Sequence, residues 1–326
     1  VAPGLAPYLG GIDNAKGFIN ARFGMLPTVQ LRRTGIQEED LLDNRNATSA
    51  KASLAMHYRP TSDIDINYAF RFGHGNSVYQ GSEKYVLRNF TSFSNKIEAT
   101  GKNFMVRSYM TQTNAGDSYN MTALGSYTNE LLAGTSAAWA PTYLGNVVGT
   151  YMQAALQNAG SPNPVPESAL FGSADLNAMA NFKGRTAADG LLPKRGTQAY
   201  NDAIQAIKAT LFQRSDPTKG ILGGASFIDN SRLFHTEATY DFTSLFKEKI
   251  GILVGANHRM YSLFTDGTVF NEDPDGTGTN SRIKINEYGA FVQATKKFFD
   301  ERFRISASLR YDKNQNFDGV ISPRVA

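Results

Sequence analysis

The sequence contains no cysteine and no apolar run of the length that a membrane helix needs. Without cysteine, the chain cannot form a disulfide framework, a thiolate metal site or a cysteine nucleophile. The most apolar stretch, residues 131–156, is interrupted by Pro141 and Asn146, so it falls short of the roughly 18 uninterrupted residues of a membrane helix. If this chain spans a membrane, β-strands must do it.

The sequence also lacks a long run of charge of one sign. Its 33 basic and 29 acidic residues give a net charge of +4 and are spread along the chain, which argues against a nucleic-acid partner. The four histidines lie far apart in the sequence, and there is no Gly-x-Ser-x-Gly motif and no phosphate-binding loop. We therefore expect neither an enzyme nor a bound cofactor.

What the sequence does contain is a strict alternation of apolar and polar residues. In residues 303–312, Phe, Ile, Ala, Leu and Tyr alternate with Arg, Ser, Ser, Arg and Asp, as expected for a strand with one wet and one apolar face. Similar alternation predicts eight strands and the start of a ninth at Ile321, over residues 50–59, 64–72, 91–100, 104–111, 234–242, 250–260, 288–295 and 303–312.

The predicted strands run about 9 to 14 residues and are joined by alternately short and long connections, for example 60–63, 74–90, 101–103 and 112–227. The strands of a soluble β-sandwich also alternate apolar and polar residues, but they average nearer 5 or 6 residues. A sandwich does not require short and long loops to alternate in this way. Aromatic residues flank the short turns, as in an interfacial girdle. We predict an all-β fold, a transmembrane antiparallel β-barrel of the Gram-negative outer membrane, with short turns periplasmic and long loops extracellular.

Two regions interrupt the strands. Residues 1–47, which include a helical pattern at 35–42, are expected to form an extracellular-loop-like segment, and residues 48–326 to form the barrel strands with a large extracellular insertion at 112–227. Within the insertion, residues 142–159 and 197–214 are predicted to be helical, the second through an apolar stripe at helical spacing. The chain starts without a methionine or a leader pattern, so we expect an internal stretch of a longer protein.

Candidate ligand-binding residues are the polar side chains whose parity points them into the barrel lumen: Arg71, Arg107, Glu237, Asn257, Arg259 and Gln293. His57 and His235 share this face, where an outer-membrane hydrolase could use one, although ordinary lumen polarity is favoured. The carboxylates of residues 271–276 could hold calcium, but Pro274 and Gly276 favour a simple turn, and we expect no metal. Trp139 could stack on a sugar, but a role in the core of the loop is favoured.

Residues 288–324 resemble the barrel of TonB-dependent outer-membrane receptors. The resemblance lies in Phe299-Asp300 at a short turn, in Arg310-Tyr311-Asp312 at the end of a strand, and in Ser322-Pro323-Arg324 at the start of the next. It implies an arc of a 22-stranded barrel whose plug is not in the chain, and energy supplied by TonB through that plug. Arg310 and Asp312 also have a structural interpretation, as neighbours that pair with each other on the lumen face.

The function implied by the resemblance is active import of a nutrient too large for porins, such as an iron chelate, a glycan, a peptide or cobalamin. The expected partners are the TonB complex, a surface lipoprotein, and outer-membrane lipid or lipopolysaccharide. Two alternatives remain open at this point: a receptor-like barrel with a structural or binding role in a larger assembly, and a passive outer-membrane channel.

Overall fold

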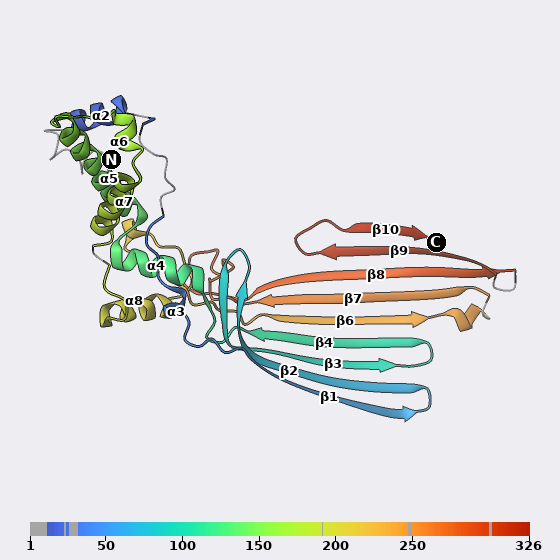
Figure 1. Ribbon diagram of the computed structural model, residues 1–326. Helices are drawn as coiled ribbons and strands as arrows, with labels where there is room; N and C mark the ends of the chain where they lie inside the picture. The colour runs from blue at the N-terminus through green and yellow to red at the C-terminus, as the bar shows by residue number, and fades with distance from the viewer. Residues whose placement is uncertain (1–11, 23, 26–31, 191, 247–248, 300–301) are drawn as a thin grey trace. The chain divides into compact units, whose positions relative to one another are not determined.

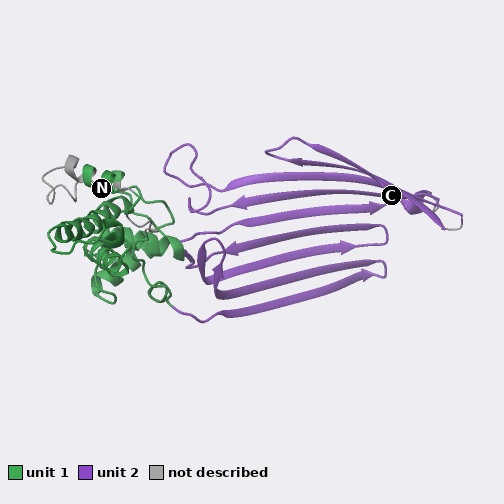
Figure 2. Ribbon diagram, turned by 45° about the horizontal axis from the view of Figure 1, so that its top comes forward, with its two compact units in different colours: residues 1–43, 121–225 green, residues 44–120, 226–326 purple. Residues whose placement is uncertain are grey.

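The computed structural model describes residues 12–22, 24–25, 32–190, 192–246, 249–299 and 302–326. The chain divides into two compact units, one formed by residues 1–43 and 121–225 and the other by residues 44–120 and 226–326 (Figure 2). The first unit is helical, and the second is a β-sheet (Figure 1). The boundary after the fourth long strand falls at Met121 rather than at residue 112, because that strand continues to Asn114 and a short strand follows it.

The second unit is a single antiparallel sheet in which each long strand pairs with the next one along the chain (Figure 1). The sheet is open, with the first and last strands at its two edges, and the short strand β5 pairs with β3 beside the main path. The strands are β1 (Thr48–Thr61), β2 (Ile64–Gln80), β3 (Lys84–Thr100), β4 (Phe104–Asn114), β5 (Tyr119–Asn120), β6 (Arg232–Asp241), β7 (Gly251–Leu263), β8 (Ile283–Phe298), β9 (Phe303–Asn314) and β10 (Val320–Val325).

The connection between β2 and β3 differs from the one expected. The prediction of a long loop over residues 74–90 is wrong, because both strands have 17 residues and only residues 81–83 separate them. A tilted membrane strand needs about 9 to 11 residues, so this hairpin extends beyond the length that a bilayer requires. The long connections are those between β4 and β6 and between β7 and β8.

The register shows that the strands are staggered relative to their short turns. One row of directly paired residues passes from Ile66, two residues beyond the start of β2, to Tyr311, eight residues beyond the start of β9. The row therefore shifts by six residues over six strand pairs. An offset of one residue per strand corresponds to a tilt of about 35° for ordinary strand spacings, within the range of closed barrels.

One face of the sheet carries a belt of apolar side chains. When its upper border is measured from the turn of each strand, the border lies at a similar height on all of these strands. On each strand from β2 to β9 the last large apolar or aromatic residue of this face lies between six and ten residues from the turn, and the next residue on the same face is polar. These last residues are Phe72, Phe93, Met110, Phe234, Met260, Tyr288 and Tyr311. At the tilt above, the belt is about 20 to 25 Å tall, which matches the apolar band of an outer-membrane barrel.

Five polar side chains interrupt this belt: four are hydrogen-bonded to another side chain, and the fifth, Lys296 on β8, lies two residues from the turn with its ammonium 5.1 Å from the centre of the Phe298 ring. Ser108 and Thr236 are 2.9 Å apart on neighbouring strands, Tyr68 donates to Asn95 over 2.7 Å, and His258 lies 3.0 Å from Asn286. Such pairing avoids the cost of leaving a polar group unsatisfied in hydrocarbon.

In the helical unit α5 packs against α7, and α4 packs against α8. Contacts between α3 and α4 join the segment that precedes β1 to the helices that follow β5. Its helices are α2 (Ile12–Ala21), α3 (Glu38–Leu41), α4 (Met121–Ala133), α5 (Ser136–Ala159), α6 (Glu167–Phe171), α7 (Ala174–Ala188) and α8 (Gln198–Ala209), with a 3-10 turn at Pro217–Lys219. Among the described residues, none of the helices is long and apolar enough to cross a membrane.

Two predicted helices needed new boundaries. The first starts at Ser136 instead of residue 142, because Thr135 caps it and the helix continues across Pro141. The second ends at Ala209 instead of residue 214, because Thr210 has an extended backbone and the chain turns into a small hairpin. The apolar residues Leu211 and Phe212 therefore lie outside the helix, whereas Tyr200, Ile204 and Ile207 form its buried stripe.

Candidate functional site

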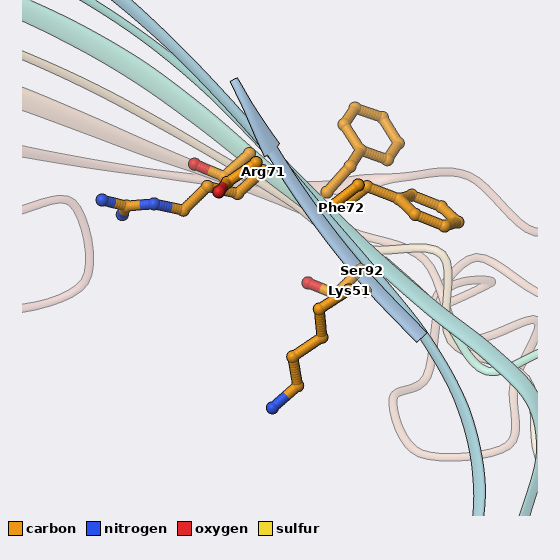
Figure 3. A pocket seen from close by; sticks show the side chains of 9 residues that line it. Lys51, Arg71, Phe72 and Ser92 are labelled. Atoms are coloured by element: carbon orange, nitrogen blue, oxygen red, sulfur yellow. The ribbon is translucent and has the colours of Figure 1, made fainter. Parts of the chain in front are cut away.

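The candidate site is the face of the sheet opposite the apolar belt, here called the polar face. Figure 3 shows how the alternation separates the two: Arg71 and Lys51 extend to one side of the strands, and Phe72 extends to the other. A hollow lined by these residues takes side chains from both faces, because the wall is only one sheet thick. It is a surface feature of the wall rather than an enclosed cavity.

Arg107 on β4 is the centre of a charged cluster on the polar face. It is directly paired with Glu98 on β3 and with Glu237 on β6. Its guanidinium donates to Glu237 and, over 3.4 Å, to Glu98. His235, two residues from Glu237 on the same strand, places Nε2 3.3 Å from that carboxylate. The cluster thus holds one arginine between two carboxylates, with a histidine beside them.

A second cluster lies further along the same row of paired residues. Asn257 on β7 is paired with Gly289 on β8, which is paired with Asp312 on β9. The Arg310 guanidinium binds both carboxylate oxygens of Asp312 at 2.7 Å, and it also reaches Asn257 Oδ1 over 3.2 Å. The structural pairing expected for Arg310 and Asp312 is confirmed.

Gly289 makes this reach across β8 possible. A Cβ atom at this position would lie 2.5 Å from Asn257 Oδ1, 2.8 Å from Asp312 Oδ1 and 2.9 Å from Arg310 Nη2. Any side chain would therefore occupy the space through which Arg310 passes.

The structure brings together some of the six predicted site residues but not all of them. Arg107, Glu237 and Asn257 are consecutive members of one row, and Arg259 lies two residues from Asn257 on β7, where it pairs with Glu287 at 3.2 Å. Gln293 also lies on the polar face, nearer the turns, and bonds Thr295 over 3.4 Å. Arg71 stands apart on β2, between Ser53 and Ser94.

Sequence reasoning missed the carboxylates that hold these arginines, Glu98 and Glu287. Glu98 lies in a strand with weak alternation, and Glu287 lies in the part of β8 that precedes the predicted start at residue 288. Parity alone would have placed both on the polar face once the strands had been extended. The partners of Arg107 and Arg259 depend in addition on the register, which the sequence does not fix.

The acidic loop between β7 and β8 uses its carboxylates to bind its own backbone. Glu272 is 1% exposed and accepts from the amides of Thr265 and Gly267. Asp273 accepts from the amides of Gly278 and Thr277, each at 2.8 Å, and these bonds hold the pKa of that carboxyl below its usual value. Over the described ranges no group of three or more metal-ligating side chains is present, and the loop has the geometry of the turn that Pro274 and Gly276 predicted.

Trp139 belongs to the core of the helical unit. It is 3% exposed, stacks on Tyr143 with ring centroids 5.1 Å apart, and donates from Nε1 to Asp189 over 2.7 Å. A sugar could not reach a ring that is enclosed in this way, and the role in the loop core is the correct one.

Comparison with known proteins relates the C-terminal part of the sequence to a family of barrels. Residues 172–326 match the family model described as TonB dependent receptor-like, beta-barrel, and no curated protein matches the sequence. Of the Phe299-Asp300 motif at the short turn between β8 and β9, Asp300 lies outside the residues that the structure describes.

Three solved structures from Pseudomonas aeruginosa show weak similarity. OprD is 8% identical, and the match covers 86% of this chain and 54% of OprD with a TM-score of 0.31. OccK5 (OpdH) is 8% identical, with 84% of this chain and 56% of OccK5 covered and a TM-score of 0.25. OccK10 (OpdN) is 9% identical, with 84% of this chain and 59% of OccK10 covered and a TM-score of 0.24. The chain spans between half and three fifths of their lengths, and scores this low carry no argument about function. The resemblance of the last forty residues to TonB-dependent receptors is confirmed by this family match, which extends it to residues 172–326; the family is a class of outer-membrane β-barrel.

Proposed function

We propose that this chain is part of a TonB-dependent active transporter that imports a nutrient too large for porins across the outer membrane. The observation that carries the proposal is the division of the sheet into two faces: a level apolar belt about 20 to 25 Å tall outside and a row of charged and amide side chains inside. The family match agrees with it. The proposal assigns no enzymatic activity to the chain.

In this proposal the polar face lines the path of the cargo. The side chains of Arg107 and Arg259 are 37% and 36% exposed, so part of each guanidinium group remains open to a hydrated cargo. The candidate cargoes are iron chelates, glycans, peptides and cobalamin. The proposed partners are TonB, acting through a plug, a surface lipoprotein over the entrance, and lipopolysaccharide around the belt.

The orientation follows from the lengths of the connections. Outer-membrane barrels have tight turns on the periplasmic side and longer loops outside. The short turns after β1, β3 and β8 would then be periplasmic, and the helical unit and the loop between β7 and β8 would be extracellular.

The test is the energy dependence of uptake through the intact protein. We expect cells that express it to accumulate labelled cargo from a nutrient mixture, and we expect accumulation to fall to the level of cells without the protein when TonB is deleted or when a protonophore is added. A strain with an unrelated porin is the control for general damage to the envelope. Equilibration that is unchanged without TonB would contradict the proposal and indicate a passive channel, and the absence of any uptake would indicate a structural or binding role.

A further inference from the structure

Two cations on the polar face of β1 and β2, Lys51 and Arg71, differ from three arginines further along this face. Arg107, Arg259 and Arg310 each lie close to a carboxylate. Within the described part of the chain, neither Lys51 nor Arg71 has an ion pair or a side-chain hydrogen bond. Both side chains are exposed, so their charge is not compensated by the wall around them.

The strand register brings these two cations together. Lys51 is directly paired with Gly73, and Arg71 with Ser53, so the two are diagonal neighbours on adjacent strands. Diagonal neighbours on one face lie about 7 to 8 Å apart, within the reach of two long side chains toward a common point. Figure 3 shows both extending to the same side of the strands.

The surroundings of the pair contain hydroxyl groups and no acid. Arg71 is paired with Ser94 on β3, and Gly73 with Ser92, so Ser53, Ser92 and Ser94 surround the two cations. Gly73 leaves open space between Lys51 and Ser92, since a Cβ there would meet only Ser92 O at 3.9 Å. Two cations and several hydroxyl donors without a carboxylate form the donor set that binds phosphate or carboxylate groups.

We infer that Lys51 and Arg71, with the hydroxyls of Ser53, Ser92 and Ser94, form an anion-binding patch on the lumen wall that takes a phosphate or carboxylate group of the cargo. The patch lies six to ten residues from the short turns, in the upper part of the wall. The inference rests on the proposed function for its location in a lumen. In the middle of this face Arg107, Arg259 and Arg310 are each neutralised by a carboxylate, so the positive potential there is concentrated at the patch.

The experiment measures protection of Arg71 from phenylglyoxal in the intact protein in detergent, where no transport is needed. Inorganic phosphate is added in one series and succinate in another, and mass spectrometry follows the modification of individual arginines. We expect added anion to slow the modification of Arg71 at least threefold while Arg304, an exposed arginine of the same face near the turns, is modified at an unchanged rate. Protection by only one of the two anions identifies the preferred group.

A variant distinguishes the patch from a general effect of salt. Lys51→Gln should raise the anion concentration needed for half protection roughly fivefold, as loss of one nearby charge implies, whereas Arg304→Gln should leave it unchanged. The inference is overturned if Arg71 and Arg304 are protected equally, if Lys51→Gln has no effect, or if Arg71 is already unreactive without added anion, which would show that another part of the protein covers it. Because uptake is not measured, these outcomes are independent of the test of active transport.

Discussion

At the scale of the residue, the polar face is held together by cross-strand side chains, and one glycine decides whether two of them meet. Arg310 reaches over β8 to Asn257 only because Gly289 has no side chain. The same row contains the cluster of Arg107 with Glu237 and Glu98, so side-chain bonds join β3, β4 and β6 through Arg107 and join β7 to β9 through Arg310. Ion pairs in partly wet surroundings contribute modestly one by one. Their larger effect is to fix the side chains of the wall.

Gly289→Ala tests this role. The added methyl group would displace Arg310 or Asn257 and break at least one hydrogen bond, so we expect a loss of about 1 to 2 kcal/mol in the free energy of unfolding. Urea unfolding of the intact protein in detergent, followed by gel mobility, measures it. Gly251→Ala is the matched control, because a Cβ there meets nothing closer than 3.4 Å. Equal effects of the two substitutions would contradict the role assigned to Gly289.

At the scale of the element, the strands with complete alternation could be predicted from the sequence and the others only in part. The strand predicted at residues 303–312 is observed as Phe303–Asn314. The upper part of β3 was missed, because it pairs there with β5 as well as β2 and Val86 is fully buried. Beyond the belt the two faces no longer separate lipid from lumen, so the alternation on which the prediction depends is lost.

The helices were harder to predict for a similar reason. The buried face of α7 consists of Leu176, Ala180, Gly184 and Ala188, which carry little hydrophobic signal at helical spacing. Gly184 allows close packing against α5, since a Cβ there would lie 2.7 Å from Val147 Cγ2. In the site, the residues of the polar face could be chosen by parity, but the ion pair of Arg107 with Glu237 could not be predicted because a large insertion separates β4 from β6 and hides their register.

A buried tyrosine in the helical unit predicts a response of that unit to alkaline pH. Tyr200 on α8 donates to Asp40 over 2.9 Å, and Arg195 bonds the same carboxylate at 2.8 Å. Burial, followed by the bond to Asp40, raises the pKa of Tyr200 from 10.0 to about 12. Because the pKa is higher in the folded unit, the stabilisation is complete below the unfolded value and is lost as the pH rises through the folded one.

The emission of Trp139, the chain's one tryptophan, measures this response. We expect the urea midpoint of the helical unit to decrease between pH 10 and 12, and we expect Tyr200→Phe to remove most of that decrease. Tyr58→Phe is the control, because Tyr58 is 66% exposed on the apolar face of β1. The same decrease in the Tyr200→Phe variant would exclude Tyr200 as its origin.

At the scale of the whole molecule, the belt and the polar face predict opposite responses to the same new charge. Leu309 and Ile305 lie on the apolar face of β9, each two residues inside a border of the belt, and Ser308 lies beside Leu309 on the polar face. Leu309→Arg and Ile305→Arg should each cost up to about 2 to 4 kcal/mol, and Ser308→Arg should be tolerated. The fraction of heat-modifiable folded protein in outer membranes measures this. Equal loss for Leu309→Arg and Ser308→Arg would contradict the assignment of the two faces.

The offset of one residue per strand also determines how wide a ring this wall can form. A strand that leans by about 35° occupies about 5.9 Å of circumference instead of 4.8 Å. The nine strands of the main path would close at a diameter of only about 17 Å between backbones, an aperture that side chains would fill. A ring of 22 such strands would be about 41 Å across, wide enough to admit a folded domain. At this lean, a ring therefore needs more strands than these nine before its lumen stays open between the side chains.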